Sequence, residues 1–287
     1  MKILFISHYC PPHIGGVEKH VESISKVLKK NGHKVVVIAK DHPLKYPDIK
    51  FVGLIKIWVE LFKLRKVIKD SDVIHIHDVF IWYLPFRFLY PNKKVYITFH
   101  GGRQDFPSVP FKYKFFLKIA HKLTDGSIAV GGYIGKYFQI KPNAVIYGGV
   151  SKNKPTRVKN KIKNSIVWLG RLDKESDLPQ FLDWLKNEKR KYKVVFVGDG
   201  DMKKECSKFG EVVGFVKDPK AYISKPEIVV PVGYLSYLEA KQAEATVMTF
   251  PKTSMKKDYW RGIEKLSIVP TWESVVDVYL KLWGTTD

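Results

Sequence analysis

The chain has 287 residues, which is enough for two domains of ordinary size, each with its own core. Its 45% hydrophobic content excludes a disordered chain, and its two cysteines, Cys10 and Cys206, exclude a disulfide framework. No uncharged apolar run approaches the roughly 18 residues that cross a bilayer, and no signal peptide precedes the first strand, so we expect a cytoplasmic protein.

The formal net charge of +22 predicts an anionic partner. Nucleic acid, anionic lipid and phosphorylated substrates all satisfy such a charge, and the charge alone does not choose between them. A lysine-rich surface is also common in thermophile proteins, which is the plainer explanation. Nucleic acid is the least expected of these partners, because the chain has no zinc-finger, homeodomain or RNP signature.

The first thirty residues indicate a strand, a glycine-containing loop and a helix. Residues 2–7 (KILFIS) are typical of a buried parallel strand, and the helix after the loop has apolar residues every three or four positions and ends at Asn31-Gly32. In the loop, Gly15 and Gly16 allow a bulky anion to approach, and the N–H groups at a helix N-terminus favour phosphate. The loop has neither dinucleotide-binding nor P-loop spacing, so a tight turn without a ligand is the alternative.

Strands and helices continue to alternate up to residue 150. We predict strands at 35–39, 72–76, 94–99, 127–130 and 144–147. We predict helices at 54–69, at 80–90 with an interruption at Pro85, at 111–122 and at 133–138. This alternation predicts a parallel sheet covered on both faces, with ligands at the carboxyl ends of its strands. By that rule Gly15-Gly16, His77-Asp78 and residues 100–102 share one edge.

Residues 151–164 (SKNKPTRVKNKIKN) are polar and lysine-rich, as a linker between domains should be. Alternation then restarts, with strands predicted at 166–169, 194–197, 211–213, 228–230 and 246–250 and helices at 178–189, after 201 and at 235–244. We therefore predict an α/β protein with four parts: an N-terminal domain at 1–150, a linker at 151–164, a second domain at 165–270 and a C-terminal helix at 271–287.

Taken in order, the motifs of the chain resemble those of the family-4 retaining glycosyltransferases, which have the GT-B fold. The resemblance rests on PPHIGGVEKHV, DVIHIHD, TFHGG, VIYGGV, VWLGRLD, VFVGDGD, VVGFVKD, YLEAK and TWESVVDVYLKLW, at roughly the family's spacing. It implies two Rossmann-like, doubly wound domains facing across a cleft, with the C-terminal helix returning to the first. It also implies a hexosyltransferase that uses a UDP- or GDP-linked donor and a hydroxyl acceptor, lipid-linked or polysaccharide, without a metal or other cofactor.

The resemblance implies a role for each matching residue. Arg171 is expected beside the donor diphosphate, where a guanidinium pairs two oxygens, and His100 is expected at the donor sugar near the reacting carbon. Glu239 is expected to accept hydrogen bonds from the ribose hydroxyls. The backbone at Gly15 and Gly16 is expected at the phosphates. The backbone at Gly214 and Phe215 is expected at the base.

Three positions depart from the family pattern. The lysine usual five residues after the arginine is Ser176, although Lys174 lies nearby in the sequence. The glutamate usual eight residues before Glu239 is Pro231, and the asparagine usual in VIYGGV is Gly148. Because the lost cation removes a charge-assisted contact of about 1.5 to 3 kcal/mol, the alternative is a catalytically impaired GT-B protein that binds nucleotide as a scaffold.

Four residues of the first domain suggest a metal cluster. His75, His77, Asp78 and His100 come from neighbouring strand ends, but no spacing among them demands the three converging ligands of a catalytic zinc. We therefore expect no metal.

Two stretches, 81–90 and 111–122, combine aromatic and basic residues. Such residues suit helices that lie on an anionic bilayer, which predicts a peripheral position at the membrane. The alternative is that the aromatic side chains pack on the sheet while the lysines extend into solvent.

Overall fold

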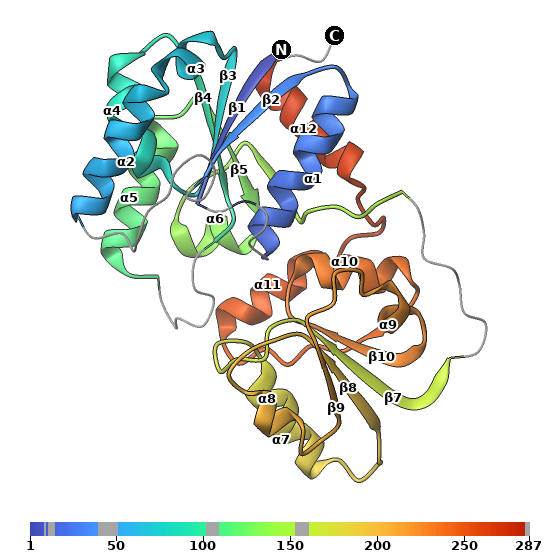
Figure 1. The fold of residues 1–287 in the computed structure, drawn as a ribbon. Coiled ribbons are helices and arrows are strands. Elements are labelled where there is room, and N and C mark those ends of the chain that lie inside the picture. The colour runs from blue at the N-terminus through green and yellow to red at the C-terminus, as the bar shows by residue number, and fades with distance from the viewer. Residues whose placement is uncertain (9, 11–14, 40–50, 102–108, 153–160, 285–287) are drawn as a thin grey trace. The chain divides into compact units, whose positions relative to one another are not determined.

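The computed structural model describes residues 1–8, 10, 15–39, 51–101, 109–152 and 161–284, with the backbone alone at 51 and 52. These residues form two compact units, each built on its own parallel sheet (Figure 1). Unit 1 contains the described residues up to 146 together with 272–284, and unit 2 contains those from 147 to 271. The α/β fold class predicted from the alternating pattern is confirmed.

Unit 1 has a six-stranded sheet in the order β2-β1-β3-β4-β5-β6, with every neighbouring pair parallel. β1, β3 and β5 are almost completely buried, which explains their continuous apolar character. The strands are β1 (Lys2–Ser7), β2 (Lys34–Ile38), β3 (Val73–His77), β4 (Lys94–Phe99), β5 (Gly126–Val130) and β6 (Ala144–Ile146).

Helices cover both faces of this sheet. Figure 1 shows α1 and α12 on one side of the sheet and α2, α4 and α5 on the other. The helices are α1 (Gly16–Lys30), α2 (Phe51–Lys63), α3 (Arg65–Asp70), α4 (Phe80–Leu89), α5 (Phe111–Lys122), α6 (Tyr133–Phe138) and α12 (Trp272–Trp283). The last helix therefore returns to the first unit, as the resemblance implied.

Two helix predictions in unit 1 need correction. The single helix predicted at 54–69 divides at Leu64 into α2 and α3. The interruption predicted at Pro85 is absent, because α4 continues through the proline. A proline leaves the carbonyl four residues earlier without its helical N–H partner. Here that carbonyl belongs to Ile81, and the indole N–H of Trp58 on α2 donates to it at 3.1 Å.

Unit 2 has a five-stranded parallel sheet in the order β11-β10-β7-β8-β9. The strands are β7 (Ile162–Leu169), β8 (Lys193–Val197), β9 (Glu211–Gly214), β10 (Pro226–Pro231) and β11 (Thr246–Val247). The helices are α7 (Leu178–Asn187), α8 (Lys203–Cys206), α9 (Lys220–Ser224), α10 (Tyr234–Gln242) and α11 (Ser254–Glu264). α9 and α11 were not predicted, and β7 begins inside the predicted linker.

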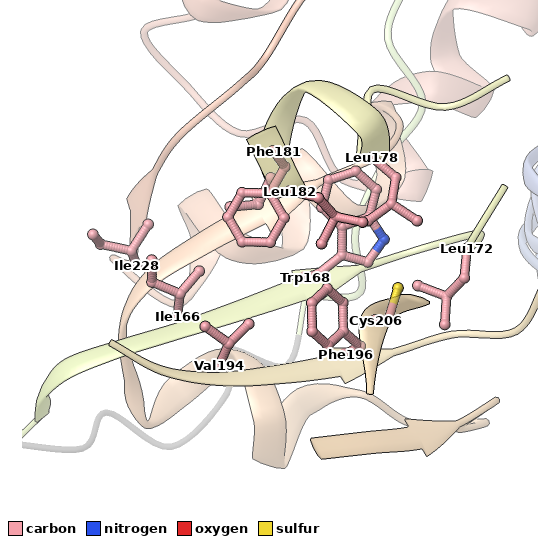
Figure 2. Close-up of a cluster of buried hydrophobic side chains, with 11 residues drawn as sticks. Ile166, Trp168, Leu172, Leu178, Phe181, Leu182, Val194, Phe196, Cys206 and Ile228 are labelled. Atoms are coloured by element: carbon pink, nitrogen blue, oxygen red, sulfur yellow. The ribbon is translucent and has the colours of Figure 1, made fainter. Parts of the chain in front are cut away.

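The core of unit 2 forms where α7 packs on β7 and β8. Figure 2 shows Trp168 of β7 among the buried side chains of this cluster, and its ring stacks on Phe181 of α7 with centroids 5.4 Å apart. Phe196 of β8 meets the edge of the Phe181 ring. Burial of these rings fixes α7, and therefore the loop that leads from β7 into α7, on the sheet.

Candidate functional site

The strand order of unit 2 reverses direction between β7 and β10. Chain connections leave this point in opposite directions, so the loops at the carboxyl ends of the two strands separate and leave room for a ligand. The loop after β7 begins with Gly170 and Arg171, and the loop after β10 contains Val232 and Gly233. This edge of the sheet is therefore the candidate binding edge of unit 2.

Arg171 extends from this edge into solvent. Its side chain is 68% exposed and forms an ion pair with Asp173, with Nη1 and Oδ2 3.1 Å apart. Its carbonyl oxygen accepts hydrogen bonds from Trp168 Nε1 at 3.3 Å and Ser176 Oγ at 3.4 Å. The loop backbone is thus held by the core, while the guanidinium is available for an anion.

Ser176 occupies the position of the lysine usual in the family, and it serves the loop itself. The residue is buried, its hydroxyl donates to the carbonyl of Asp173 at 2.7 Å, and its N–H donates to Asp173 Oδ1 at the same distance. This arrangement closes the turn before α7. It supplies no positive charge.

A buried lysine that the sequence analysis missed lies at the same edge. Lys256 of α11 is 7% exposed, its Nζ lies 3.8 Å from Asp177 Oδ2, and it donates to the carbonyl of Val232 at 3.4 Å. Burial lowers the pKa of Lys256, and repulsion from Arg171 lowers it further, while Asp177 raises it. Lys256 therefore joins the end of the Arg171 loop to the loop after β10 and adds a positive charge there.

The sequence signal for Lys256 is the helix that carries it. Thr253 caps α11 by accepting a hydrogen bond from the N–H of Lys256 at 3.1 Å, which is a recognisable helix start. The buried residues that follow, Met255, Tyr259 and Ile263, are spaced by four. The ring of Tyr259 lies 4.4 Å from the lysine Nζ.

The remaining predicted residues of unit 2 lie on the elements that continue this edge. Glu239 is a half-buried residue of α10, the helix that follows β10. Gly214 ends β9 with a φ of +86°, a conformation that favours glycine, and its carbonyl accepts from the N–H of Gly198 after β8. Phe215 is 51% exposed. β9 is separated from β7 by β8, so Phe215 and Arg171 come from different parts of the edge.

Unit 1 has its own reversal of strand order, between β1 and β3. α1 begins here, with Gly15 as its extended N-cap and Gly16 as its first residue. A side chain at Gly15 would collide with the Glu18 carboxylate, whereas no atom of the described residues lies within 4 Å of a Cβ placed on Gly16. Glu18 lies in the first turn of α1, beside the positive end of the helix.

His100 follows β4 at the same edge and is held by its neighbours. Its Nε2 lies 3.0 Å from Nδ1 of His77, and its backbone N–H donates to Asp78 Oδ1 at 2.8 Å. Asp78 has a φ of +64°, and burial raises the pKa of its carboxyl to about 7. Burial lowers the pKa of both histidines well below the usual value, so both rings are neutral at pH 7.

The edge of unit 1 also contains two buried polar atoms without a hydrogen-bond partner in the described part of the chain. They are Ser7 Oγ and His77 Nε2, on residues that are register partners in β1 and β3. Side chains of register partners in parallel strands point to the same face of the sheet. A polar group of a ligand, or a water molecule, would satisfy both atoms.

Beneath this edge, a chain of hydrogen bonds connects α12 to the sheet and to α1. Trp283 Nε1 donates to His75 Nδ1 at 3.0 Å, and because His75 is neutral, its Nε2 donates to Thr98 Oγ1 at 2.7 Å. Thr98 Oγ1 lies 2.8 Å from the hydroxyl of Tyr279, which lies 2.9 Å from His20 Nε2. The indole, which can only donate, sets the direction of the first two hydrogen bonds and the tautomer of His75.

The histidines of unit 1 do not form a metal site in the described residues. No three His, Cys, Asp or Glu side chains within those ranges are arranged so that they could hold a metal ion. His75 and His20 are instead engaged with Trp283, Thr98 and Tyr279, as described above. Likewise, none of the described helices is long and apolar enough to cross a membrane.

Two parallel α/β sheets, each covered by helices, are typical of the GT-B fold, and comparison with solved structures agrees. Sucrose-phosphate synthase from Thermosynechococcus elongatus matches with a TM-score of 0.72 at 14% identity, over 99% of this chain and 100% of that one. Anabaena HepE, in complex with UDP and glucose, matches with a TM-score of 0.64 at 15% identity, over 98% and 89% of the two chains.

Sequence comparison gives the same class of protein. Residues 14–154 match the model of Glycosyltransferase Family 4. The chain is also 29% identical over 230 residues to the uncharacterized glycosyltransferase MJ1178 of Methanocaldococcus jannaschii, and 23% identical over 253 residues to MJ1069 of the same organism. These alignments cover 73% and 70% of this chain but only 63% and 64% of the relatives, so the chain spans less than two thirds of either. Residues 14–154 are therefore similar to the family-4 glycosyltransferase domain.

Proposed function

We propose that the protein is a retaining glycosyltransferase that moves a hexose from a UDP- or GDP-linked donor to a hydroxyl acceptor. The observation that carries the proposal is the carboxyl edge of unit 2, where the exposed guanidinium of Arg171 stands beside the buried ammonium of Lys256. Two positive charges at a topological switch point suit a diphosphate. The presence of UDP and of UDP-glucose in structures of HepE supports this donor class.

In the proposed reaction, the acceptor oxygen bonds to the anomeric carbon on the face from which the phosphate oxygen leaves. The acceptor proton passes to that leaving oxygen, so the products are a glycoside and a nucleoside diphosphate, and no protein base is required. Arg171 stabilises the charge that develops on the diphosphate. His100 can meet a sugar hydroxyl only through Nδ1, because its Nε2 bonds to His77.

The nucleoside end of the donor is proposed to extend along the same edge. The Glu239 carboxylate accepts hydrogen bonds from the ribose hydroxyls, and the backbone of Gly214 and Phe215 meets the base. With two cations from the protein, the reaction is proposed to need no metal, and addition of EDTA should leave turnover unchanged.

The test is sugar transfer from a panel of UDP- and GDP-linked hexoses, with the anomeric configuration of the product read by NMR. Arg171→Ala is expected to lower turnover by about a hundredfold or more, the usual effect of removing a group that stabilises developing charge. Glu239→Ala is expected mainly to weaken donor binding. Full turnover by Arg171→Ala contradicts the assignment.

Lys256 has a matched control in its neighbour Lys257, which is exposed on the same helix. Lys256→Met is expected to weaken UDP binding, measured by calorimetry, by about tenfold through loss of one nearby charge, with Lys256→Arg restoring part of it. Lys257→Met is expected to bind UDP as the wild type does. Equal affinities for the two methionine variants remove Lys256 from the proposal.

A second function, a nucleotide-binding scaffold without catalysis, is favoured by one observation. The hydroxyl of Ser176 is used to hold its own loop, and Pro231 stands where the family has a glutamate, so two donor contacts of the family are missing. A donor that raises the melting temperature of the protein without any release of sugar supports the scaffold. Release of sugar supports the transferase.

A further inference from the structure

Helix α5 presents its large apolar side chains to solvent. Phe111, Phe115 and Phe116 are 82%, 53% and 57% exposed, whereas the buried residues of the helix are Leu117 and Ala120. Large apolar side chains therefore lie on the exposed face of α5 as well as on its buried face. For these phenylalanines the packing alternative raised by the sequence is wrong. We call the exposed side chains Phe111, Lys112, Phe115, Phe116 and Lys118 the aromatic–basic surface.

Neighbouring helices extend the apolar character of this side of unit 1. α4 and α5 follow the adjacent strands β3 and β4, so right-handed crossovers place both on the same face of the sheet, as Figure 1 shows. On α4, Phe88 and Leu89 are 67% and 53% exposed. On α2, Ile55, Val59 and Phe62 form an exposed stripe at helical spacing. Apolar exposure over three helices marks an interaction surface.

The charge of this region has one sign. Between residues 79 and 124 the sequence has eight lysines and arginines and one acidic residue, Asp105, which lies outside the described residues. α5 alone has four lysines and no carboxylate, and the lysines alternate with the rings. The partner that complements this surface is therefore anionic over an extended area.

We infer that the aromatic–basic surface docks on an anionic lipid bilayer. Cores of protein interfaces are depleted in lysine, whereas rings at the level of the lipid headgroups with lysines beside them are favoured at a bilayer surface. A single-stranded nucleic acid stacks on rings but gains nothing from Ile55, Val59 and Leu89. α5 is the next described helix after β4 and His100, so its N-terminus lies toward the same carboxyl edge of the sheet, and a docked membrane is on the His100 side of unit 1. The inference that the acceptor is lipid-linked rests on the proposed function, whereas the inference that this surface docks on a membrane does not.

The test is co-sedimentation of the full chain with vesicles of phosphatidylcholine, with and without one quarter phosphatidylglycerol, in the absence of any donor. We expect binding to the anionic vesicles at low salt and its loss in high salt. The triple variant Phe111→Ser, Phe115→Ser, Phe116→Ser should bind about tenfold less or weaker still. Because all three rings are exposed, circular dichroism and the melting temperature of this variant should match the wild type.

Charge has its own matched pair of variants. Lys112→Glu with Lys118→Glu is expected to reduce vesicle binding about tenfold or more, whereas Lys189→Glu with Lys191→Glu, exposed in unit 2, changes the net charge equally and should leave binding unchanged. Equal loss in both pairs overturns the surface and leaves only net charge. The inference is also overturned if the wild type does not bind anionic vesicles at low salt. It is overturned as well if the wild type forms a dimer that the triple serine variant does not form, or binds an oligonucleotide that the triple serine variant does not bind. Vesicle binding without sugar transfer overturns the proposed function alone.

Discussion

The buried histidine His20 makes the stability of unit 1 sensitive to acid. Burial lowers its pKa from 6.5 in the unfolded chain to about 3 in the folded protein, and the residue is 2% exposed. Because the pKa of His20 is lower in the folded protein than in the unfolded chain, the unfolded chain binds a proton at a higher pH than the folded protein does. Its contribution to stability is complete above pH 6.5 and is lost as the pH falls below that value, down to the folded pKa.

The size of the effect follows from the two pKa values. Between pH 7 and pH 5 the unfolded histidine takes up about three quarters of a proton and the folded one almost none, which lowers the free energy of unfolding by about 2 kcal/mol. His75, His77 and His100 act in the same direction. Asp78 acts in the opposite direction, because burial raises the pKa of its carboxyl to about 7 and the protonated form is therefore favoured in the fold.

The variant His20→Gln isolates one histidine from this sum. Tyr279 and His20 Nε2 share a hydrogen bond, and a glutamine side chain can either accept or donate in its place, so the variant should fold. Urea unfolding of both proteins at pH 7 and pH 5 is expected to show a loss about 2 kcal/mol smaller in His20→Gln. Asp78 and the other histidines are present in both proteins and cancel in this difference. Equal losses would refute the assignment of a neutral, desolvated His20.

Two further predictions concern the tyrosine hydroxyls of unit 1 and the glycine at the start of α1. Tyr279→Phe leaves Thr98 and His20 without their shared partner and should lower the free energy of unfolding, measured in urea, by about 1 to 3 kcal/mol. Tyr83→Phe removes an equally buried hydroxyl that has no partner among the described residues, so it should be neutral or stabilising. A larger loss in Tyr83→Phe than in Tyr279→Phe contradicts the hydrogen-bond chain. Gly16→Ala places a methyl at the start of α1, where no described atom lies within 4 Å, and should raise stability by up to about 1 kcal/mol while it weakens UDP binding. Unchanged UDP affinity argues against phosphate at this turn.

The sequence was sufficient for the elements whose pattern depends on burial alone. The strands at 2–7, 94–99 and 194–197 are buried apolar runs, and the structure has them within a residue. α11 was missed because its apolar residues are separated by lysines and an aspartate, so its pattern is weak without the Thr253 cap. Pro85 was misjudged for a different reason. Its cost is offset by Trp58 of another helix, and no local pattern reports such a tertiary hydrogen bond.

The same limit applies to the candidate site. Arg171, Glu239 and His100 could be proposed from motifs because each stands next to a strand or helix that the motif includes. Lys256 could not, because the family has its lysine at position 176 and this charge comes from α11, eighty residues later in the chain. Likewise, the composition of α5 gives no sign of whether its rings face the sheet or the solvent. Only the buried positions of Leu117 and Ala120 decide that question.

The position of α12 has a consequence for how the protein is made. Unit 1 is discontinuous in the sequence, since its last helix is translated only after all of unit 2. Until then, His75 and Thr98 lack the indole and the phenol that later bond to them. The described residues of unit 2, by contrast, form one continuous segment, 147–152 and 161–271, that is complete before α12 is translated. During synthesis the second unit is therefore able to mature first, and the first waits for the return of the chain.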